Sequence, residues 1–199
     1  MAEHYFTEKP KSELRERTIH AFLRGNALEF QTASSMFSPD RIDLGTELLV
    51  NECRIEDGWR VLDLGCGYGP VGIAIAKAFS RAIVVMTDVN ERAVAFAKKN
   101  AKKNGISATA FQGDGYAAVK DMFFNTILLN PPQTAGKKVC FSMIEEAKLH
   151  LLKDGFLQVV ARHRKGGRTL SEKMNEVFGN VEVLGIQSGY RIYASQNRS

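Results

Sequence analysis

Three glycines at alternate positions, preceded by an acid, carry the clearest chemical signal in the sequence. The apolar run VLDL at 61–64 leads into GCGYG at 65–69. Glycines permit a tight turn and let a ligand approach the backbone closely, and an ordinary strand-to-helix turn seldom needs three of them. Dinucleotide-binding loops use the different spacing G-x-G-x-x-G. A carboxylate at Asp63 would repel a pyrophosphate but suits a cation, so the pattern predicts a site for a positively charged ligand.

Two further acids follow the next two strand candidates. Asp88 lies 23 residues after Gly65, where doubly wound folds place the acid that binds ribose hydroxyls. Asp114 comes next, and it could accept a hydrogen bond from an adenine amino group. Each has a plainer interpretation, Asp88 as part of a helix N-cap and Asp114 as a Gly-Asp-Gly turn. Because the carboxyl ends of parallel strands meet at one edge of a sheet, we expect the three acids to line one pocket.

An acceptor site is suggested by Asn130, Pro131 and Pro132, which follow the fourth strand candidate. Prolines lack an N–H donor and keep the backbone extended, which fixes the direction of the carbonyl groups. The Asn130 side-chain oxygen and the Pro131 carbonyl could both accept hydrogen bonds from one amino group. The lone pair of a base amine is delocalised, and two aligned acceptors would orient it and favour developing positive charge. Taken alone, the motif fits a plain turn equally well.

Other chemistries find little support in the sequence. Attack on carbon 5 of a pyrimidine needs a cysteine nucleophile beside the cofactor. Cys66 falls inside the glycine loop and Cys140 within a helical pattern, so neither is well placed. The three cysteines form no C-x-x-C pair and the four histidines are scattered. We therefore expect neither a disulfide framework nor a metal site.

Alternating strands and helices must position these residues. The strand candidates are short apolar runs bounded by Gly, Asp, Asn or Pro, at Arg60–Leu64, Ala82–Thr87, Ala108–Gln112, Thr126–Leu129, Phe156–Ala161, Asn180–Leu184 and Arg191–Ala194. The helix candidates between them are Pro70–Phe79, Glu91–Asn104, Lys137–Leu152 and Thr169–Phe178. This alternation implies right-handed crossovers, and it predicts an α/β fold with a Rossmann-like, doubly wound, mostly parallel seven-stranded sheet whose last strand is antiparallel.

The first 55 residues follow a different pattern. We expect a helix over Glu13–Leu23, a loop over Ser34–Gly45 and a helix over Thr46–Cys53 that leads into the first strand. The apolar content of this segment is too small for a core of its own. Residues 1–55 are therefore predicted to form an extension packed on a catalytic domain of residues 56–199.

Composition narrows the class of protein. Of the 199 residues, 44% are hydrophobic and 25% are charged, which is typical of a globular domain. The sequence has no run of about 18 apolar residues and no apolar signal-peptide core near Met1, so we expect no membrane contact. Together with the unpaired cysteines, this favours a cytoplasmic protein. A net charge of +5 and a pI of about 9.1 permit a polyanionic partner without requiring one.

The combination of DLGCGYG with Asp88 and Asp114 resembles the class I S-adenosylmethionine-dependent methyltransferases. The resemblance implies that S-adenosylmethionine is the cofactor and that the loop from Asp63 to Gly69 contacts its methionine part. It also implies that Asp88 binds the ribose and that Asp114 lies beside the adenine. The cofactor-binding residues expected on this basis are Thr46, Asp63, Leu64, Gly65, Cys66, Gly67, Asp88, Val89, Gly113 and Asp114.

A narrower similarity covers nearly the whole chain. The chain resembles the small-subunit ribosomal RNA guanine-N2 methyltransferase family, in particular its single-domain archaeal type, in Phe37-Ser38, Asp43, Gly45-Thr46, DLGCGYGPVGI, NPPQTAGK, Lys165-Gly166-Gly167 and Gly189-Tyr190-Arg191. The resemblance implies that segment 37–46 lies over the cofactor pocket. Amino-methyltransferases usually carry an aromatic residue after N-P-P, where this chain has Gln133. Another ring must then stack on a base, and the candidates are Phe6, Phe37 and Tyr190, although an ordinary core or surface aromatic is the plainer interpretation of each.

A cluster of basic side chains follows the fifth strand candidate, whose carboxyl end lies beside that of the fourth in a parallel sheet. Arginine binds phosphate through paired hydrogen bonds, so this cluster predicts an RNA-binding rim, although a solvated charged loop is the plainer alternative. The substrate-binding residues expected in all are Phe37, Gln133, Arg162, Arg164, Lys165 and Arg168.

The sequence thus predicts an S-adenosylmethionine-dependent N-methyltransferase, with Asn130, Pro131 and Pro132 at the reacting amine. The expected acceptor is an exocyclic base amine of RNA, above all guanine N2 of ribosomal RNA. Transfer RNA, a protein amide or a small amine are alternative acceptors. A non-catalytic RNA-binding or assembly protein with a retained cofactor pocket is the alternative of another class. The oligomeric state is open.

Overall fold

A seven-stranded sheet forms the centre of the computed structural model, which describes residues 15–34, 36, 38–132 and 136–199. Its strand order is β5-β4-β3-β6-β7-β9-β8. Neighbours among β3 to β7 are parallel, and β9 is antiparallel to both β7 and β8. The expected doubly wound sheet with an antiparallel last strand is confirmed. The strands are β3 (Arg60–Leu64), β4 (Ile83–Asp88), β5 (Thr109–Gln112), β6 (Phe124–Leu129), β7 (Leu151–Arg162), β8 (Glu182–Gln187) and β9 (Tyr190–Gln196).

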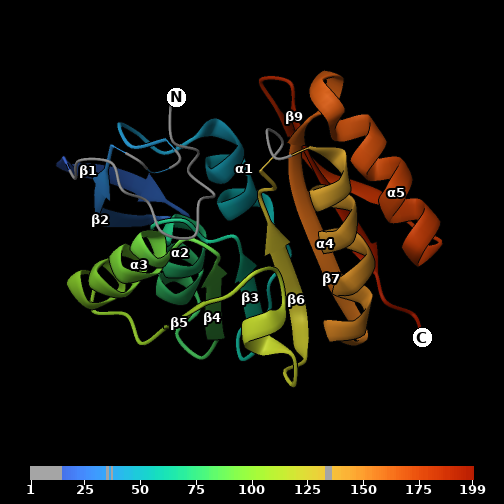
Figure 1. Cartoon of the computed structure of the whole chain (residues 1–199), viewed down its shortest axis with the longest axis horizontal. Helices are drawn as coiled ribbons and strands as arrows, with labels where there is room; N and C mark the ends of the chain where they lie inside the picture. The colour runs from blue at the N-terminus through green and yellow to red at the C-terminus, as the bar shows by residue number, and fades with distance from the viewer. Residues whose placement is uncertain (1–14, 35, 37, 133–135) are drawn as a thin grey trace.

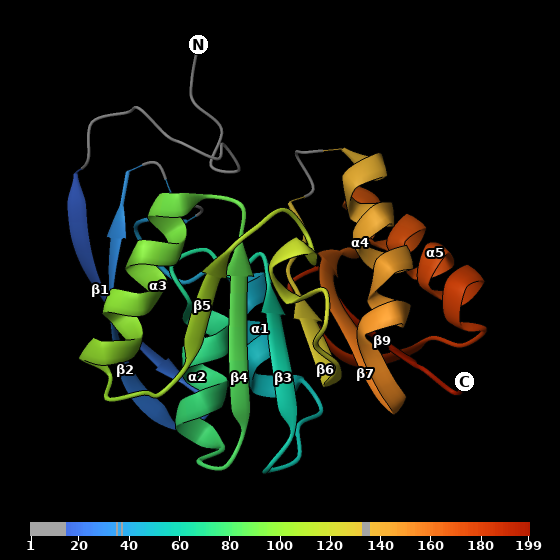
Figure 2. The same ribbon diagram turned by 60° about the horizontal axis from the view of Figure 1, so that its bottom comes forward.

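Helices cover both faces of the sheet (Figures 1 and 2). One face packs against α1 (Leu44–Glu52), α2 (Pro70–Ala78) and α3 (Glu91–Lys103), and the other packs against α4 (Lys137–His150) and α5 (Arg168–Phe178). Side chains along each strand alternate between the two cores, as the period of two requires. In β3, for example, Val61 belongs to the first core and Leu62 to the second.

The chain reverses its direction of travel across the sheet beside β3. From β3 it moves outward through β4 to β5, and then it returns to β6 on the other side of β3. Open α/β sheets bind ligands in the crevice at such a switch point, outside the carboxyl ends of the strands. The ends of β3, β4 and β6 are therefore where a site is expected.

The N-terminal segment differs from the sequence prediction. The helix predicted over Glu13–Leu23 is wrong, because the chain forms strand β1 (Glu16–Leu23) and pairs antiparallel with β2 (Asn26–Ala33). Ile19 and Leu23, four residues apart, are both buried. This spacing puts two residues on one face of a helix, but residues four apart also share a face in a strand. Gly25, with φ +78°, lies in the turn of the hairpin. A glycine at this place is the local signal that favours two strands over a helix.

Two asparagines of α3 fasten this hairpin to the domain. Asn100 pairs with the backbone of Gln31, accepting from its N–H (2.7 Å) and donating to its carbonyl (2.9 Å). Asn104 does the same with Glu29, at 3.1 and 2.8 Å. The two side chains thus stand where a further strand would pair with β2. Asn100 also donates to the Tyr68 carbonyl (2.9 Å), which connects the hairpin to the glycine loop.

Smaller differences concern the ends of elements. The helix expected to end at Leu152 ends at His150, and the strand expected from Phe156 already begins at Leu151. The helix expected from Thr46 begins at Leu44, because Asp43 caps its N-terminus. No helix among the described residues is long and apolar enough to span a membrane.

Candidate active site

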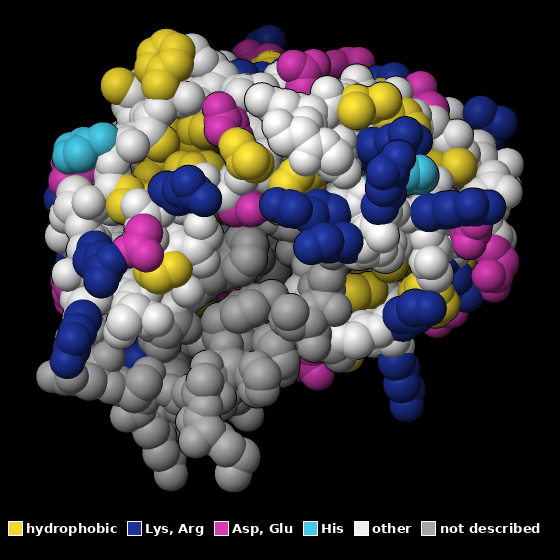
Figure 3. All heavy atoms as spheres, turned by 90° about the horizontal axis from the view of Figure 1, so that it is seen from above, with side chains coloured by type: hydrophobic (Ala, Val, Ile, Leu, Met, Phe, Trp, Pro, Cys, Tyr) yellow, Lys and Arg dark blue, Asp and Glu magenta, His cyan; other side chains and the backbone are white. Residues whose placement is uncertain are grey.

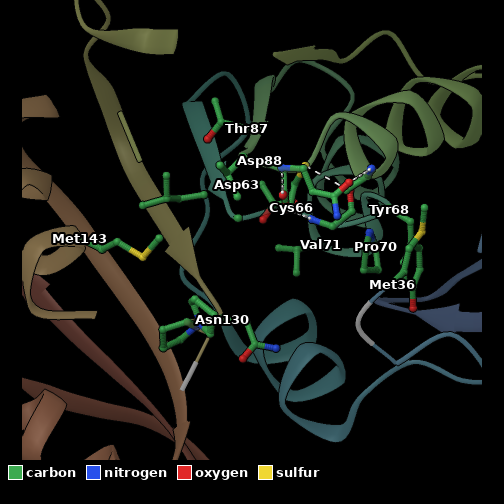
Figure 4. A pocket seen from close by; sticks show the side chains of 18 of the residues that line it. Met36, Asp63, Cys66, Tyr68, Pro70, Val71, Thr87, Asp88, Asn130 and Met143 are labelled. Atoms are coloured by element: carbon green, nitrogen blue, oxygen red, sulfur yellow. Dashed lines mark hydrogen bonds between the residues drawn. The ribbon is translucent and has the colours of Figure 1, made fainter. Parts of the chain in front are cut away.

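A cavity of about 340 Å³ lies at the carboxyl ends of the central strands. Most of its wall comes from the glycine loop, from the ends of β4 and β6, and from the segment before α1. All ten residues expected to bind the cofactor line it, as do Asn130, Pro131 and Pro132. The structure therefore brings the three acids and the N-P-P turn into one cavity (Figure 4).

The glycine loop is shaped to bring the backbone close to a ligand. Gly65 and Gly67 have φ values of +71° and +57°, in the left-handed region where a side chain is strained. Apart from their chain neighbours, no atom of the described residues lies within 4 Å of where a Cβ would sit at either position. The N–H groups of Gly65 and Cys66 donate to the Thr87 carbonyl at 2.8 and 2.9 Å. These bonds attach the loop to the end of β4.

Asp88 holds the other side of the same loop. Its Oδ2 accepts from the Gly67 N–H at 2.8 Å, and its Oδ1 accepts from the Asn90 N–H at 2.8 Å. Burial raises the pKa of Asp88, although both hydrogen bonds favour the ionised form. A carboxylate oxygen can accept more than one hydrogen bond, so each oxygen keeps capacity for a ligand hydroxyl.

Asp63 is buried beneath the loop, on the α2 side of the sheet. Its Oδ2 accepts from the Gly72 N–H at 2.8 Å. Burial raises the pKa of Asp63 to about 7, and the charge of Asp88 acts in the same direction. A cationic ligand in the cavity would favour the ionised form of this acid.

One polar atom of the wall has no partner in the described part of the chain. The Thr87 hydroxyl is buried and lines the cavity, but it makes no hydrogen bond with any described residue. Buried hydroxyls are rarely left unpaired, so this oxygen is available to a polar group of a ligand.

Asn130 is held by residues from the start of α1. Its Nδ2 lies 3.0 Å from Thr46 Oγ1 and 3.3 Å from Asp43 Oδ2. Asp43 also caps α1, accepting from the N–H groups of Gly45 (2.9 Å) and Thr46 (3.1 Å). The Tyr190 hydroxyl donates to Asp43 Oδ1 at 3.1 Å. Three segments that are distant in sequence thus meet at the N-P-P turn.

Tyr190 was a candidate to stack on a base, and the structure gives its ring another position. The ring packs against Gly45, where a Cβ would come within 2.8 Å of Tyr190 Cε1. The Arg162 guanidinium lies over the ring at 4.8 Å from its centroid. With 9% of its surface exposed and no part in the cavity wall, Tyr190 is not placed to stack on a substrate.

The remaining predicted substrate residues divide into two groups. Phe6, Phe37 and Gln133 lie outside the described residues. Arg162, Arg164, Lys165 and Arg168 are exposed at the end of β7 and the start of α5, and none lines the cavity. Figure 3, which looks onto the edge where the central strands end, shows Lys and Arg side chains gathered on the side of β7 and α5.

Several wall residues were not expected from the sequence. Val139 and Met143 of α4 line the cavity, although their spacing indicated only the inner face of a helix, and Figure 4 shows the Met143 side chain extending into it. Met36 and Tyr68 close another side. Their residue types are common in cores, so the sequence offered no signal apart from their place in the fold.

Metal chemistry has no visible basis in the part of the chain that the structure describes. No group of three or more His, Cys, Asp or Glu side chains there is arranged to hold an ion. Cys53, Cys66 and Cys140 are buried free thiols. Burial raises the pKa of Cys66 well above its ordinary value, and the charges of Asp63 and Asp88 add to this effect, so the thiol stays protonated.

This strand order, with the cavity at the carboxyl end of β3 and acids after the first three strands, defines the class I S-adenosylmethionine-dependent methyltransferases. Within that class, the chain belongs to the methyltransferase small domain family, whose profile matches residues 27–194. The chain is accordingly a methyltransferase, and its cofactor is S-adenosylmethionine.

Individual relatives fall into two groups. The uncharacterized protein YbxB of Bacillus subtilis is 38% identical over 197 residues, which cover 96% of this chain and 97% of that protein. A ribosomal RNA small subunit methyltransferase C of Haemophilus influenzae is 30% identical over 196 residues, which cover 95% of this chain but 58% of the relative. The chain spans about half the length of the relatives that carry this second name.

Solved structures agree on the fold. The T. thermophilus 16S rRNA N2 G1207 methyltransferase, in complex with AdoMet and guanosine, superposes with a TM-score of 0.80 at 23% identity, covering 95% of this chain and 52% of that one. A methyltransferase from Pyrococcus furiosus gives a TM-score of 0.64 at 20% identity, covering 72% of this chain and 77% of that one. At these identities the likeness establishes the fold.

Proposed function

We propose that this chain methylates an exocyclic base amine of RNA, and that guanine N2 of ribosomal RNA is the preferred acceptor. The observation that carries the proposal is the position of the Asn130–Pro132 turn, which lines the same cavity as the glycine loop. The acceptor base is inferred from the names of the relatives, among them a 16S rRNA N2 G1207 methyltransferase and several ribosomal RNA small subunit methyltransferases.

The cavity suits S-adenosylmethionine in size and in chemistry. Its volume of about 340 Å³ falls within the range of small-ligand sites, about 300–1,000 Å³. Asp88 is proposed to bind the two ribose hydroxyls, and Asp114 the adenine edge. The backbone of the glycine loop, with Asp63 beneath it, would receive the methionine part, and the Thr87 hydroxyl offers a further polar contact. When bound, the cofactor supplies an activated methyl group on a positively charged sulfur.

The acceptor end of the cavity orients the amine. Asn130 Oδ1 and the Pro131 carbonyl are proposed to accept its two hydrogen bonds, which leaves the lone pair directed toward the cofactor. No strong base is required, because the amine proton becomes acidic as positive charge develops and leaves to water. Val139, Met143 and Pro132 offer apolar surface for the base at the same end.

RNA is proposed to contact the basic rim formed by Arg162, Arg164, Lys165 and Arg168, and Phe37 and Gln133 stay predicted substrate residues. Residues 1–55 are treated as an extension of the catalytic domain of residues 56–199. In support, Leu28 and Phe30 of the hairpin share a core with α1 and α2, while Asp43 and Thr46 line the cavity. A cytoplasmic location stays a prediction from cysteine usage.

Nucleoside analysis of labelled RNA tests the proposal. The protein would be incubated with tritiated S-adenosylmethionine and, in separate reactions, with ribosomal RNA, assembled small subunits, transfer RNA or a protein extract. We expect label in ribosomal RNA or small subunits, and mass spectrometry of the nucleosides should identify N2-methylguanosine. Label confined to transfer RNA, protein or another base would refute the acceptor. Cofactor binding with no transfer to any acceptor would favour a non-catalytic protein.

The Asn130→Ala variant tests the role of the turn. Removing the amide oxygen should lower methyl transfer about 10²- to 10³-fold, as losses of single positioned hydrogen-bond groups do. Cofactor affinity, measured by calorimetry, should change little because Asn130 is assigned to the acceptor. Unchanged turnover in this variant would remove Asn130 from the mechanism.

A further inference from the structure

We propose that Asp43 and Thr46 are positioning residues that set which end of the Asn130 amide faces the cavity. They hold the Nδ2 end, so that Oδ1 is presented as a hydrogen-bond acceptor. The inference rests on the proposed function, in which this oxygen binds the substrate amine. It assigns to the start of α1 a task in the chemistry of a residue 84 to 87 positions away.

The chemistry of the partners decides the orientation. A side-chain amide has a donor end and an acceptor end of nearly equal shape, so its orientation follows from its neighbours. A carboxylate accepts hydrogen bonds and donates none. The Asp43 oxygen at 3.3 Å therefore selects the NH₂ end of Asn130, and Thr46 Oγ1 at 3.0 Å accepts the second proton. Both N–H protons are thereby occupied.

The opposite orientation would defeat the acceptor site. It would bring the Asn130 oxygen against the Asp43 carboxylate, where two acceptors repel each other. It would also present an NH₂ group to the substrate amine, so that two donors would face each other. A base amine cannot be oriented by such a contact. The Asp43 contact thus makes the cavity selective for groups that donate hydrogen bonds.

Asp43 is itself fixed on every side. Its Oδ2, the oxygen beside Asn130, accepts from the N–H groups of Gly45 (2.9 Å) and Thr46 (3.1 Å). Its Oδ1 accepts from the Tyr190 hydroxyl at 3.1 Å. A carboxylate that accepts this many hydrogen bonds keeps a single rotamer, which is what a positioning residue needs.

Tyr190 of β9 completes the support, on the same face of the sheet as α1. Its ring fits against Gly45, where even a methyl group would come within 2.8 Å of the ring. The Arg162 guanidinium lies over the ring at 4.8 Å from its centroid. Arg162 belongs to the basic rim, so the same chain of contacts runs from the proposed RNA surface through Tyr190 and Asp43 to Asn130.

Three substitutions separate positioning from helix capping. Asp43→Ser keeps a cap for α1, because a serine hydroxyl accepts from the first-turn N–H groups, but it is too short to reach Asn130. Asp43→Asn should be milder. The Gly45 and Thr46 N–H groups select its oxygen for the Oδ2 position, and its NH₂ can donate to the Tyr190 hydroxyl. Thr46→Val removes the second acceptor in nearly the same volume, and it serves if Asp43→Ser does not fold.

We expect Asp43→Ser to lower kcat about 100-fold, the cost of misplacing a reacting group by about 1 Å. Thr46→Val should lower kcat less than Asp43→Ser does. Asp43→Asn should retain most of the activity that Asp43→Ser loses. For Asp43→Ser, which lies outside the predicted cofactor-binding residues, the Kd for S-adenosylmethionine should stay within about threefold of the parent value. The decisive comparison uses the Asn130→Ala background, where Asp43→Ser should cause no further loss. Losses that multiply in the double variant would overturn the proposal, because Asp43 would then act independently of Asn130.

A readout without RNA keeps this test separate from the test of the acceptor. The side-chain NH₂ resonances of Asn130 would be assigned by their absence from the Asn130→Ala spectrum. In Asp43→Ser they should move toward the shifts of solvent-exposed asparagines, and in Asp43→Asn they should move much less. Unmoved resonances would contradict the inference whatever the substrate is. Moved resonances without RNA methylation would contradict the proposed acceptor and leave the positioning intact.

Discussion

Asp88 holds the protein backbone with the same two oxygens that are proposed to bind the cofactor. Each accepts one backbone N–H, from Gly67 and from Asn90, and these bonds hold the glycine loop against the end of β4. The carboxylate is thus oriented before any ligand arrives. Binding then needs little reordering of the protein, which lowers its entropic cost.

Replacing Asp88 with Ala should weaken cofactor binding about 30- to 100-fold, since hydrogen bonds to a charged group contribute about 1.5–3 kcal/mol. Isothermal titration with S-adenosylmethionine measures this change directly. Asp121→Ala provides a matched control, because Asp121 is an exposed acid outside the cavity wall. Equal affinities for the Asp88 variant and the parent protein would contradict the ribose assignment.

Asp63 should make the stability of the cofactor-free protein depend on pH. Burial raises its pKa from 3.8 to about 7, so between these values the folded protein keeps a proton that the unfolded chain has lost. The free energy of unfolding therefore falls as the pH rises from about 4 to about 7, by up to about 4 kcal/mol, and then levels off. In denaturant titrations of Asp63→Asn, the free energy of unfolding should not show this fall with pH. If the free energies of unfolding of the variant and the parent protein changed with pH in parallel, the prediction would be refuted.

The residues of the site differ in how far the sequence could predict them. Asp63, Asp88 and Asn130 lie at or directly after the carboxyl ends of strands, so a local pattern locates them. Asp43 has a local signal too, as an N-cap before Leu44, but nothing near it in the sequence relates it to Asn130. Tyr190 was one of three candidate stacking rings, with an ordinary core aromatic as the plainer interpretation, and its packing against Gly45 and Arg162 favours the plainer one.

Among the elements, the hairpin β1–β2 depends on α3 for its attachment. Asn100 is fully buried and makes hydrogen bonds to the backbone of Gln31 and of Tyr68. Alanine at this position leaves three backbone groups without this partner, the buried Tyr68 carbonyl and the partly buried N–H and carbonyl of Gln31. We expect Asn100→Ala to lower the free energy of unfolding by about 3 kcal/mol, measured by urea denaturation.

Lys102→Ala on the exposed side of the same helix should change the free energy of unfolding by less than about 0.5 kcal/mol. It controls for changes in helix propensity alone. If Asn100→Ala behaved like this control, the hairpin would not depend on the asparagine.

The central strands and their helices were predictable from sequence, and the hairpin was not. Strands β3, β4 and β6 are continuous apolar runs because helices cover both of their faces, and such runs are conspicuous. The hairpin buries one face, and its polar outward residues resemble those of an amphipathic helix. Its docking also relies on Asn100 and Asn104, about 70 residues away, which no local pattern could relate to it.

For the molecule as a whole, the placement of charge matters more than its sum. The acids Asp63, Asp88 and Asp114 line the cavity, while the basic rim lies exposed beside it at the end of β7. The small net charge of +5 is therefore a sum over two different regions, an acidic pocket suited to a cation and a basic surface suited to phosphate.

Removing two charges from the rim should flatten the salt dependence of RNA binding. For single-stranded RNA, each lost phosphate contact lowers the slope of log K against log salt by about 0.7. Arg164→Ala with Lys165→Ala should thus reduce it by about 1.4. Filter binding at several salt concentrations measures the slope. The control Lys98→Ala with Lys102→Ala removes two exposed charges from α3, away from the cavity. If both double variants reduced the slope equally, the proposed contact between RNA and the rim would be contradicted.

The asparagine pair on α3 has a consequence beyond stability. A strand at the edge of a sheet exposes unpaired N–H and carbonyl groups that another chain can use for intermolecular pairing. Asn100 and Asn104 occupy those groups on Glu29 and Gln31, so one side of β2 is closed without a further strand. The same side chains that anchor the hairpin therefore also protect the protein against aggregation through β2.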